Sequence, residues 1–260
     1  MERQPSVTRG ASAGQVPASS IVGKKALLLI ALVVAAGIAA VALRNAGEKQ
    51  AVEPAAPAVD KVALKTKAEA GDPDAACKLA RALVRGDQGL PNYSEAARWF
   101  QSAVDKGHAE AMVGLAELYS VGRGVTNNPA EALRLYFAAA QKGNVRAIYS
   151  LAGLYEEGRG VKKDQIMAAK WHRLAAERGE ALAQFNLGQR YELGLGVKPD
   201  LVEAFMWLSL ASSNGIEDAG ELIGRLRKKL TKSQITEATR RKAGFSLVTT
   251  APTLTNGFQL

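Results

Sequence analysis

Five glycines recur every 36 residues along the middle of this chain: Gly71, Gly107, Gly143, Gly179 and Gly215. A fixed period between about 20 and 50 residues is typical of stacked supersecondary units. Four further sets of positions keep the same period and hold only alanine or leucine: Ala75, Ala111, Ala147 and Ala183; Leu79, Leu115, Leu151 and Leu187; Ala96, Ala132, Ala168 and Ala204; Ala103, Ala139, Ala175 and Ala211. Because one such unit is too small to bury its own apolar face, we predict a continuous core formed by stacked repeats.

The segment 108–143 shows what one repeat contains. Its first half has apolar residues at helical spacing, and the pattern ends at Gly122, a residue type that accepts the left-handed conformation at a helix C-terminus. A second helical pattern starts after Asn128 and Pro129, which suit an N-cap and a first helical turn. No stretch alternates with period two, so the sequence predicts an all-α chain of helix–turn–helix units.

The predicted helix starts also repeat. An asparagine or aspartate stands at each second-helix N-cap, and a glutamate follows three residues later in all units except the third, where Met167 replaces it: Asn92 with Glu95, Asn128 with Glu131, and Asp200 with Glu203. This spacing predicts capping boxes, in which the N-cap and the third residue bond reciprocally. Thr231 and Gln234 predict another capping box near the C-terminus.

The repeated pattern has a tyrosine and a Gly-x-Gly-Val turn, as in Leu151 to Val161, and a final Ala-Ala-x-x-Gly, as in Ala175 to Gly179. It resembles the Sel-one-like repeat, a relative of the tetratricopeptide repeat, and the resemblance covers four units: 71–107, 108–143, 144–179 and 180–215. The first unit departs from the pattern, since Leu83 replaces the tyrosine and Gln88 the second glycine. The resemblance implies a right-handed α-solenoid of antiparallel helix pairs that binds other proteins.

Shorter helical patterns flank the four units. We predict an N-terminal capping helix at 59–70, C-terminal capping helices at 216–244, and a disordered tail at 245–260 that lacks periodicity. Terminal units of a solenoid are expected to be atypical, because their outer faces meet water.

The segment 26–43 contains 18 consecutive residues without a charge. A helix of that length spans about 27 Å, enough for the hydrocarbon core of a membrane. Basic residues dominate its N-terminal flank, which predicts a single transmembrane helix with residues 1–25 in the cytoplasm, 44–58 as a linker and the repeats in the periplasm. The alternative is a cleaved signal peptide that would release the repeats into the periplasm.

The composition argues against several function classes. The net charge of +9 does not lie on the repeats, which hold 17 basic and 16 acidic residues, so we expect no nucleic-acid partner. The two histidines lie at unrelated repeat positions and Cys77 is the single cysteine, so we expect no metal site and no cofactor. Some secreted relatives in the resembling family carry disulfides and have been linked to β-lactam hydrolysis; this chain lacks those cysteines.

One surface varies while the rest of the repeat stays constant. The exposed positions of the four predicted first helices change chemistry from unit to unit: Asp74, Lys78, Arg81, Arg85; Glu110, Gly114, Glu117, Val121; Arg146, Ser150, Gly153, Glu157; Leu182, Asn186, Gln189, Leu193. Related tetratricopeptide arrays bind partners with this surface, so we predict a protein partner held by Arg81, Glu110, Glu117, Arg146, Asn186 and Gln189. The leading hypothesis is a non-enzymatic interaction scaffold or adaptor in the periplasm, anchored in the inner membrane through 26–43. The alternative is an envelope hydrolase acting on a cell-wall or β-lactam substrate.

Overall fold

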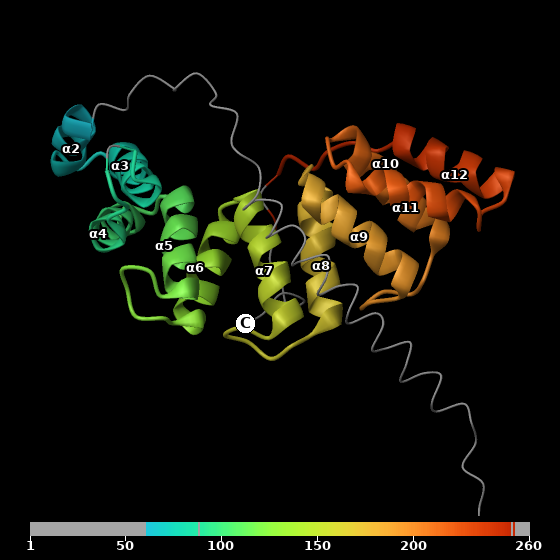
Figure 1. Ribbon diagram of the computed structural model, residues 1–260, viewed down its shortest axis with the longest axis horizontal. Coiled ribbons are helices and arrows are strands. Elements are labelled where there is room, and N and C mark those ends of the chain that lie inside the picture. Colours follow the sequence, from blue (N-terminus) through green and yellow to red (C-terminus); the bar gives the residue numbers. More distant parts are fainter. Residues whose placement is uncertain (1–60, 88, 251, 253–260) are drawn as a thin grey trace, which may run out of the picture. The chain divides into compact units, whose positions relative to one another are not determined.

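The computed structural model describes residues 61–87, 89–250 and 252, and the described residues form helices without a strand (Figure 1). The helices are α2 (Lys61–Glu69), α3 (Pro73–Arg85), α4 (Tyr93–Val104), α5 (Ala109–Val121), α6 (Pro129–Gln141), α7 (Val145–Glu157), α8 (Gln165–Ala176), α9 (Ala181–Leu193), α10 (Leu201–Ser213), α11 (Asp218–Arg227) and α12 (Lys232–Ala243). The predicted all-helical repeat solenoid is therefore confirmed for this part of the chain.

Consecutive helices pack against each other from α2 to α11, and α12 packs against α10 (Figure 1). Short loops join α3 to α4, α5 to α6, α7 to α8 and α9 to α10, so each of these pairs is a helical hairpin. The sixteen alanines and leucines that keep the 36-residue period are all buried, none with more than 3% of its surface exposed. The period in the sequence is thus the period of the core, which runs without a break through all four hairpins.

The second helices begin as predicted but are capped differently. Asn92, Asn128, Asp164 and Asp200 each accept backbone N–H bonds with their side chains. The prediction of reciprocal capping boxes is wrong for these helices, because the backbone N–H of each N-cap residue donates instead to a carbonyl nine residues earlier, at the end of the first helix. The glutamates are thereby free to bond other side chains. The capping box predicted at Thr231 and Gln234 is confirmed.

The Gly-x-Gly turns set how closely neighbouring repeats approach. Gly158 ends α7 in the left-handed conformation, with φ 78°, as expected for a C-cap. Gly160 is also left-handed, and a Cβ added there would lie 2.4 Å from the Pro129 carbonyl oxygen at the start of α6 in the preceding repeat. A Cβ at Gly196 would lie 1.9 Å from the Gln165 carbonyl oxygen, so the second glycine is required wherever a repeat precedes.

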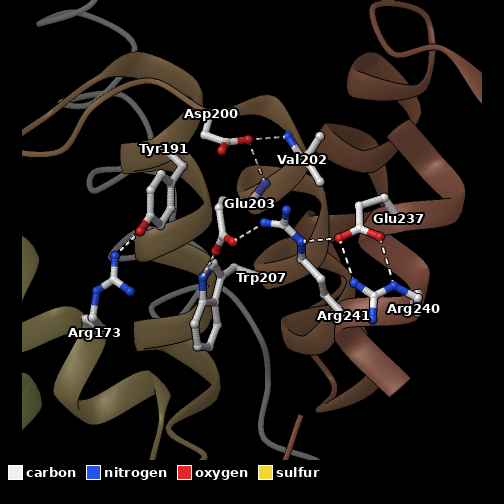
Figure 2. Close-up of polar contacts among 9 residues, drawn as sticks. All are labelled: Arg173, Tyr191, Asp200, Val202, Glu203, Trp207, Glu237, Arg240 and Arg241. Carbon is white, nitrogen blue, oxygen red and sulfur yellow. Dashed lines mark hydrogen bonds and ion pairs between the residues drawn. The ribbon is translucent and has the colours of Figure 1, made fainter. Parts of the chain in front are cut away.

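The last two helices and the start of the tail cover the end of the array. Arg241 of α12 bonds both Glu203 of α10, at 2.6 Å, and Glu237 of its own helix, at 2.7 Å, and Glu203 also accepts a bond from Trp207 Nε1 (Figure 2). Residues 245–250, which the sequence analysis expects to be disordered, then return to the third repeat. There Val248 N–H donates to the Glu177 carbonyl at 2.9 Å.

No helix among the described residues is long and apolar enough to cross a membrane. The predicted transmembrane helix at 26–43, the tail at 1–25 and the linker at 44–58 lie outside the described residues.

Candidate partner-binding face

The varying positions predicted from the sequence lie on α3, α5, α7 and α9. We call them the first-helix face: Asp74, Lys78, Arg81, Arg85, Glu110, Gly114, Glu117, Val121, Arg146, Ser150, Gly153, Glu157, Leu182, Asn186, Gln189 and Leu193. Most of these residues are exposed or half-buried, and Gly114 is buried beneath Phe100. The structure divides the face into a charged part and an uncharged part.

The charged part begins between α3 and α5. The Arg81 guanidinium bonds Glu110 Oε1, and Asn144 Nδ2 donates to Glu110 Oε2 at 2.7 Å. Partial burial of Glu110 opposes its ionisation, but the bonds from Arg81 and Asn144 outweigh burial and lower the pKa of this carboxyl. Asn144 also caps α7, so this contact fixes three successive repeats relative to one another.

A second pair of opposite sign joins α5 to α7. Arg146 Nη2 donates to Glu117 Oε1 at 2.5 Å. Burial raises the pKa of Glu117 even though Arg146 acts in the opposite direction. Both pairs join residues 29 positions apart, which is one repeat less two helical turns. The four charged residues predicted to contact a partner are therefore paired with one another. The 29-residue spacing between residues of opposite charge was the signal in the sequence that predicts this pairing.

The uncharged part comprises Ser150 and Gly153 of α7 and Leu182, Asn186, Gln189 and Leu193 of α9. At the next 29-residue step the residues are Gly153 and Leu182, which cannot form an ion pair. A Cβ at Gly153 would meet nothing within 4 Å, and Leu182 and Leu193 remain 45% and 44% exposed. Asn186 donates to Tyr149 Oη at 3.4 Å, whereas the Gln189 amide has no hydrogen-bond partner among the described residues. This part presents apolar groups and an amide to solvent.

A buried polar cluster lies at the junction of the third and fourth repeats. Arg190, with 3% of its side chain exposed, forms an ion pair with Glu156, with Nη2 3.0 Å from Oε1, and its other terminal nitrogen donates to Gln165 Oε1 at 3.1 Å. His172 Nε2 lies 3.5 Å from Glu156 Oε2. Burial, reinforced by Arg190, lowers the pKa of His172, although Glu156 opposes the shift. Burial would raise the pKa of Glu156, but His172 and Arg190 lower it.

This cluster is not among the sites predicted from the sequence, although the 36-residue period contains a signal for it. His172 stands where the other repeats have Phe100, Tyr136 and Leu208. Arg190 stands where they have alanine or leucine. A polar residue at a position that is otherwise apolar in every repeat predicts a polar partner from the neighbouring repeat, because a buried charge needs one.

The cluster contains an acid and an imidazole, but no hydroxyl or thiol is hydrogen-bonded to either within the described residues. The described part of the chain contains no group of three or more histidine, cysteine, aspartate or glutamate side chains that could hold a metal ion. Cys77 is buried, and burial raises the pKa of its thiol, which makes it a poor nucleophile.

Two solved structures illustrate what the chain is similar to. A Sel1 repeat protein from Oxalobacter formigenes is 28% identical, with 72% of this chain and 78% of that chain covered and a TM-score of 0.61. A protective antigen present in uropathogenic Escherichia coli strains, which displays an SLR fold, is also 28% identical, with 71% of this chain covered and a TM-score of 0.45. This chain spans 48% of the length of that antigen. No match was found among the curated proteins compared with it.

The family comparison agrees with the fold. The Sel1 repeat pattern matches residues 73–108, 109–144, 145–180 and 181–216, which together are more than half of the chain. Each match contains one of the four helical hairpins. The protein therefore belongs to the Sel1 repeat family.

Proposed function

We propose that this protein is a non-enzymatic scaffold or adaptor whose right-handed solenoid binds a partner protein through the uncharged part of the first-helix face. Sel1-repeat proteins generally mediate protein–protein interactions and are typically non-catalytic scaffolds. The observation that carries the proposal is the exposure of Leu182 and Leu193 beside the open surface over Gly153. Apolar side chains in the centre of a contact, surrounded by polar groups, are what a protein interface requires.

The charged part of the face has a different role in this proposal. Arg81, Glu110, Glu117 and Arg146 are already paired within the chain, so they orient successive repeats and form a polar rim. In this proposal Gln189 and Asn186 determine specificity, because their side-chain amides can hydrogen-bond to the backbone of a partner without burying a charge. The partner is therefore expected to insert apolar groups between α7 and α9.

We further propose that a transmembrane helix at 26–43 anchors the solenoid at the inner membrane and presents it in the periplasm. The support is the uncharged length of this segment and the basic residues before it. A periplasmic reporter enzyme fused after Leu260 should be active, and the chain should remain in the membrane fraction. Activity of a cytoplasmic reporter at the same position would contradict this orientation.

The binding proposal is tested by photo-crosslinking in cells. A photoreactive amino acid at Gln189 should crosslink to a discrete partner, whereas the same amino acid at the exposed Lys170 of α8 should not. Leu182→Glu should remove the Gln189 crosslink. Ile166→Glu is the matched control, because Ile166 is 59% exposed but lies on a second helix. Equal loss in both variants would contradict the assigned face, and turnover of a cell-wall or β-lactam substrate by the purified chain would favour the hydrolase alternative.

A further inference from the structure

A pocket of about 280 Å³ lies among the last three helices, outside the first-helix face. It is lined by Phe205, Ser209, Ser212 and Ser213 of α10, Ile223 and Arg227 of α11, and Thr239 and Lys242 of α12. It exists because the chain departs from the repeat here: α12 packs against α10, where a further Gly-x-Gly hairpin would otherwise continue the array. The volume lies just below the range of about 300–1,000 Å³ that is typical of small-ligand sites, and the pocket is open to solvent, since Ser212, Ser213, Arg227 and Thr239 of its lining are exposed.

The pocket carries two positive charges that are not balanced by a carboxylate. Neither Arg227 nor Lys242 forms an ion pair within the described residues, and no acidic residue lines the pocket. Four neighbouring cations differ, because each has an acidic partner: Arg225 and Lys229 bond Glu192, and Arg240 and Arg241 bond Glu237. Lys228 and Lys232 also form no ion pair within the described residues, but they do not line the pocket, where two unpaired cations come together.

Hydroxyl groups complete the polar side of the pocket. The Ser213 hydroxyl donates to the Ser209 carbonyl at 3.0 Å, and the Thr239 hydroxyl donates to the Ile235 carbonyl at 2.8 Å. The hydroxyls of Ser209 and Ser212 have no hydrogen-bond partner in the described part of the chain. Two donors thus stand beside two cations, which is the donor set that an oxyanion needs.

Two residues of the lining, Phe205 and Ile223, are apolar. Phe205 is only 4% exposed, and the Arg227 guanidinium lies over its ring at 5.9 Å from the centroid, so the ring helps to hold this cation in place. Ile223 extends the apolar wall. A bare ion would leave this wall in contact with water, whereas a ligand with an apolar body would cover it.

The walls are fixed before any ligand arrives. The bonds from Arg241 to Glu203 and Glu237 hold α12 against α10, and Figure 2 shows the three side chains in line between these helices. Lys242 Nζ donates to Ser213 Oγ at 2.6 Å, which places the ammonium at the rim. A prearranged site loses less conformational entropy when a ligand binds.

We propose that the pocket among α10, α11 and α12 binds a small ligand that joins one oxyanion to an apolar body, with Arg227 and Lys242 holding the charge and Phe205 and Ile223 contacting the body. The oxyanion is a phosphate or a carboxylate, which share this recognition chemistry. The proposal does not depend on the first-helix face.

The test is calorimetric titration of the purified full chain with two probes, phenyl phosphate and N-acetylleucine. Saturable binding of either probe is expected, and the tighter probe identifies the oxyanion. Arg227→Gln and Lys242→Gln should each weaken this binding at least tenfold. Lys228→Gln, at the C-cap of α11, and Lys232→Gln, in α12, are the matched controls, because each removes one charge outside the pocket and should change binding less than twofold.

Two further probes each lack one part of the proposed ligand: N-acetylleucinamide has no charge, and inorganic phosphate has no apolar group. N-acetylleucinamide and inorganic phosphate should both bind at least tenfold more weakly than the better of the two probes. No saturable binding of phenyl phosphate or N-acetylleucine would overturn the proposal, as would equal losses in pocket and control variants. Inorganic phosphate binding as tightly as phenyl phosphate would overturn the apolar part of the assignment. Circular dichroism melting curves confirm that each variant is folded.

Discussion

Two Glu–Arg ion pairs of this solenoid differ in burial, and we expect them to differ in their contribution to stability. Glu117 and Arg146 have 41% and 54% of their side chains exposed, so water screens their attraction. Glu156 pairs with Arg190, whose side chain is only 3% exposed. Removing the first carboxylate leaves a hydrated guanidinium, whereas removing the second leaves a buried positive charge without its partner.

We therefore expect unequal costs from the same substitution at the two sites. Glu156→Gln should lower the free energy of unfolding by about 3 kcal/mol, at the low end of the range for broken buried pairs because Glu156 is itself partly exposed. Glu117→Gln should lower it by less than about 1 kcal/mol. Urea denaturation of the two variants and the wild type measures both values, and equal costs would contradict the assigned depths.

At the scale of the elements, glycines serve two separate purposes. Gly160 lies in a turn with φ 72° and faces the start of α6 in the preceding repeat. Gly153 lies inside α7, and a Cβ there would meet nothing within 4 Å. The first glycine is required by the turn and by the contact, whereas the second only leaves the surface of α7 open.

Alanine substitutions should therefore act in opposite directions. Gly160→Ala should destabilise the protein by about 2 kcal/mol or more, since a left-handed alanine costs roughly 1–2 kcal/mol before the contact with Pro129 is counted. Gly153→Ala should stabilise it by up to about 1 kcal/mol through helix propensity. Thermal unfolding followed by circular dichroism compares the pair, and a stabilising Gly160→Ala would show that the close approach is absent.

At the scale of the whole molecule, the array is not uniform along its length. In three of the four repeats the residues equivalent to His172 and to Arg190 are apolar, whereas at the junction of the third and fourth repeats His172 and Arg190 lie together with Glu156. His172 also faces the Tyr149 ring, with centroids 5.7 Å apart. Because the folded state lowers the pKa of His172, the unfolded chain binds its proton more readily than the folded protein does.

Stability should consequently fall as pH drops below about 6.5, the usual pKa of histidine, by up to about 1.4 kcal/mol per pH unit. His172→Leu should reduce this slope between pH 6.5 and 5, since Leu208 stands at the same position in the fourth repeat. The raised pKa of Glu117 acts in the opposite direction but is common to both proteins, so it cancels in the difference. Urea denaturation across this pH range measures the slopes, and identical slopes would contradict the role of His172.

The sequence by itself determined the parts of this protein that repeat. The alanine and leucine positions, the helix starts at asparagine or aspartate and the glycine stops depend on residues close together in the chain, or on a constant spacing that stacking preserves. The residues of the candidate face could also be chosen from the sequence, because they differ from repeat to repeat whereas the core positions stay the same.

Only the tertiary structure decided how the side chains of different repeats meet. It paired Arg81 with Glu110 and Glu117 with Arg146, directed the N-cap N–H groups to carbonyls of the first helices, and assembled Arg227 and Lys242 into one pocket. These contacts depend on the distance and rotation between packed helices, which are set by the whole stack. The 36-residue period predicts that neighbouring repeats are in contact, but the packing geometry determines which of their polar atoms come within hydrogen-bonding distance.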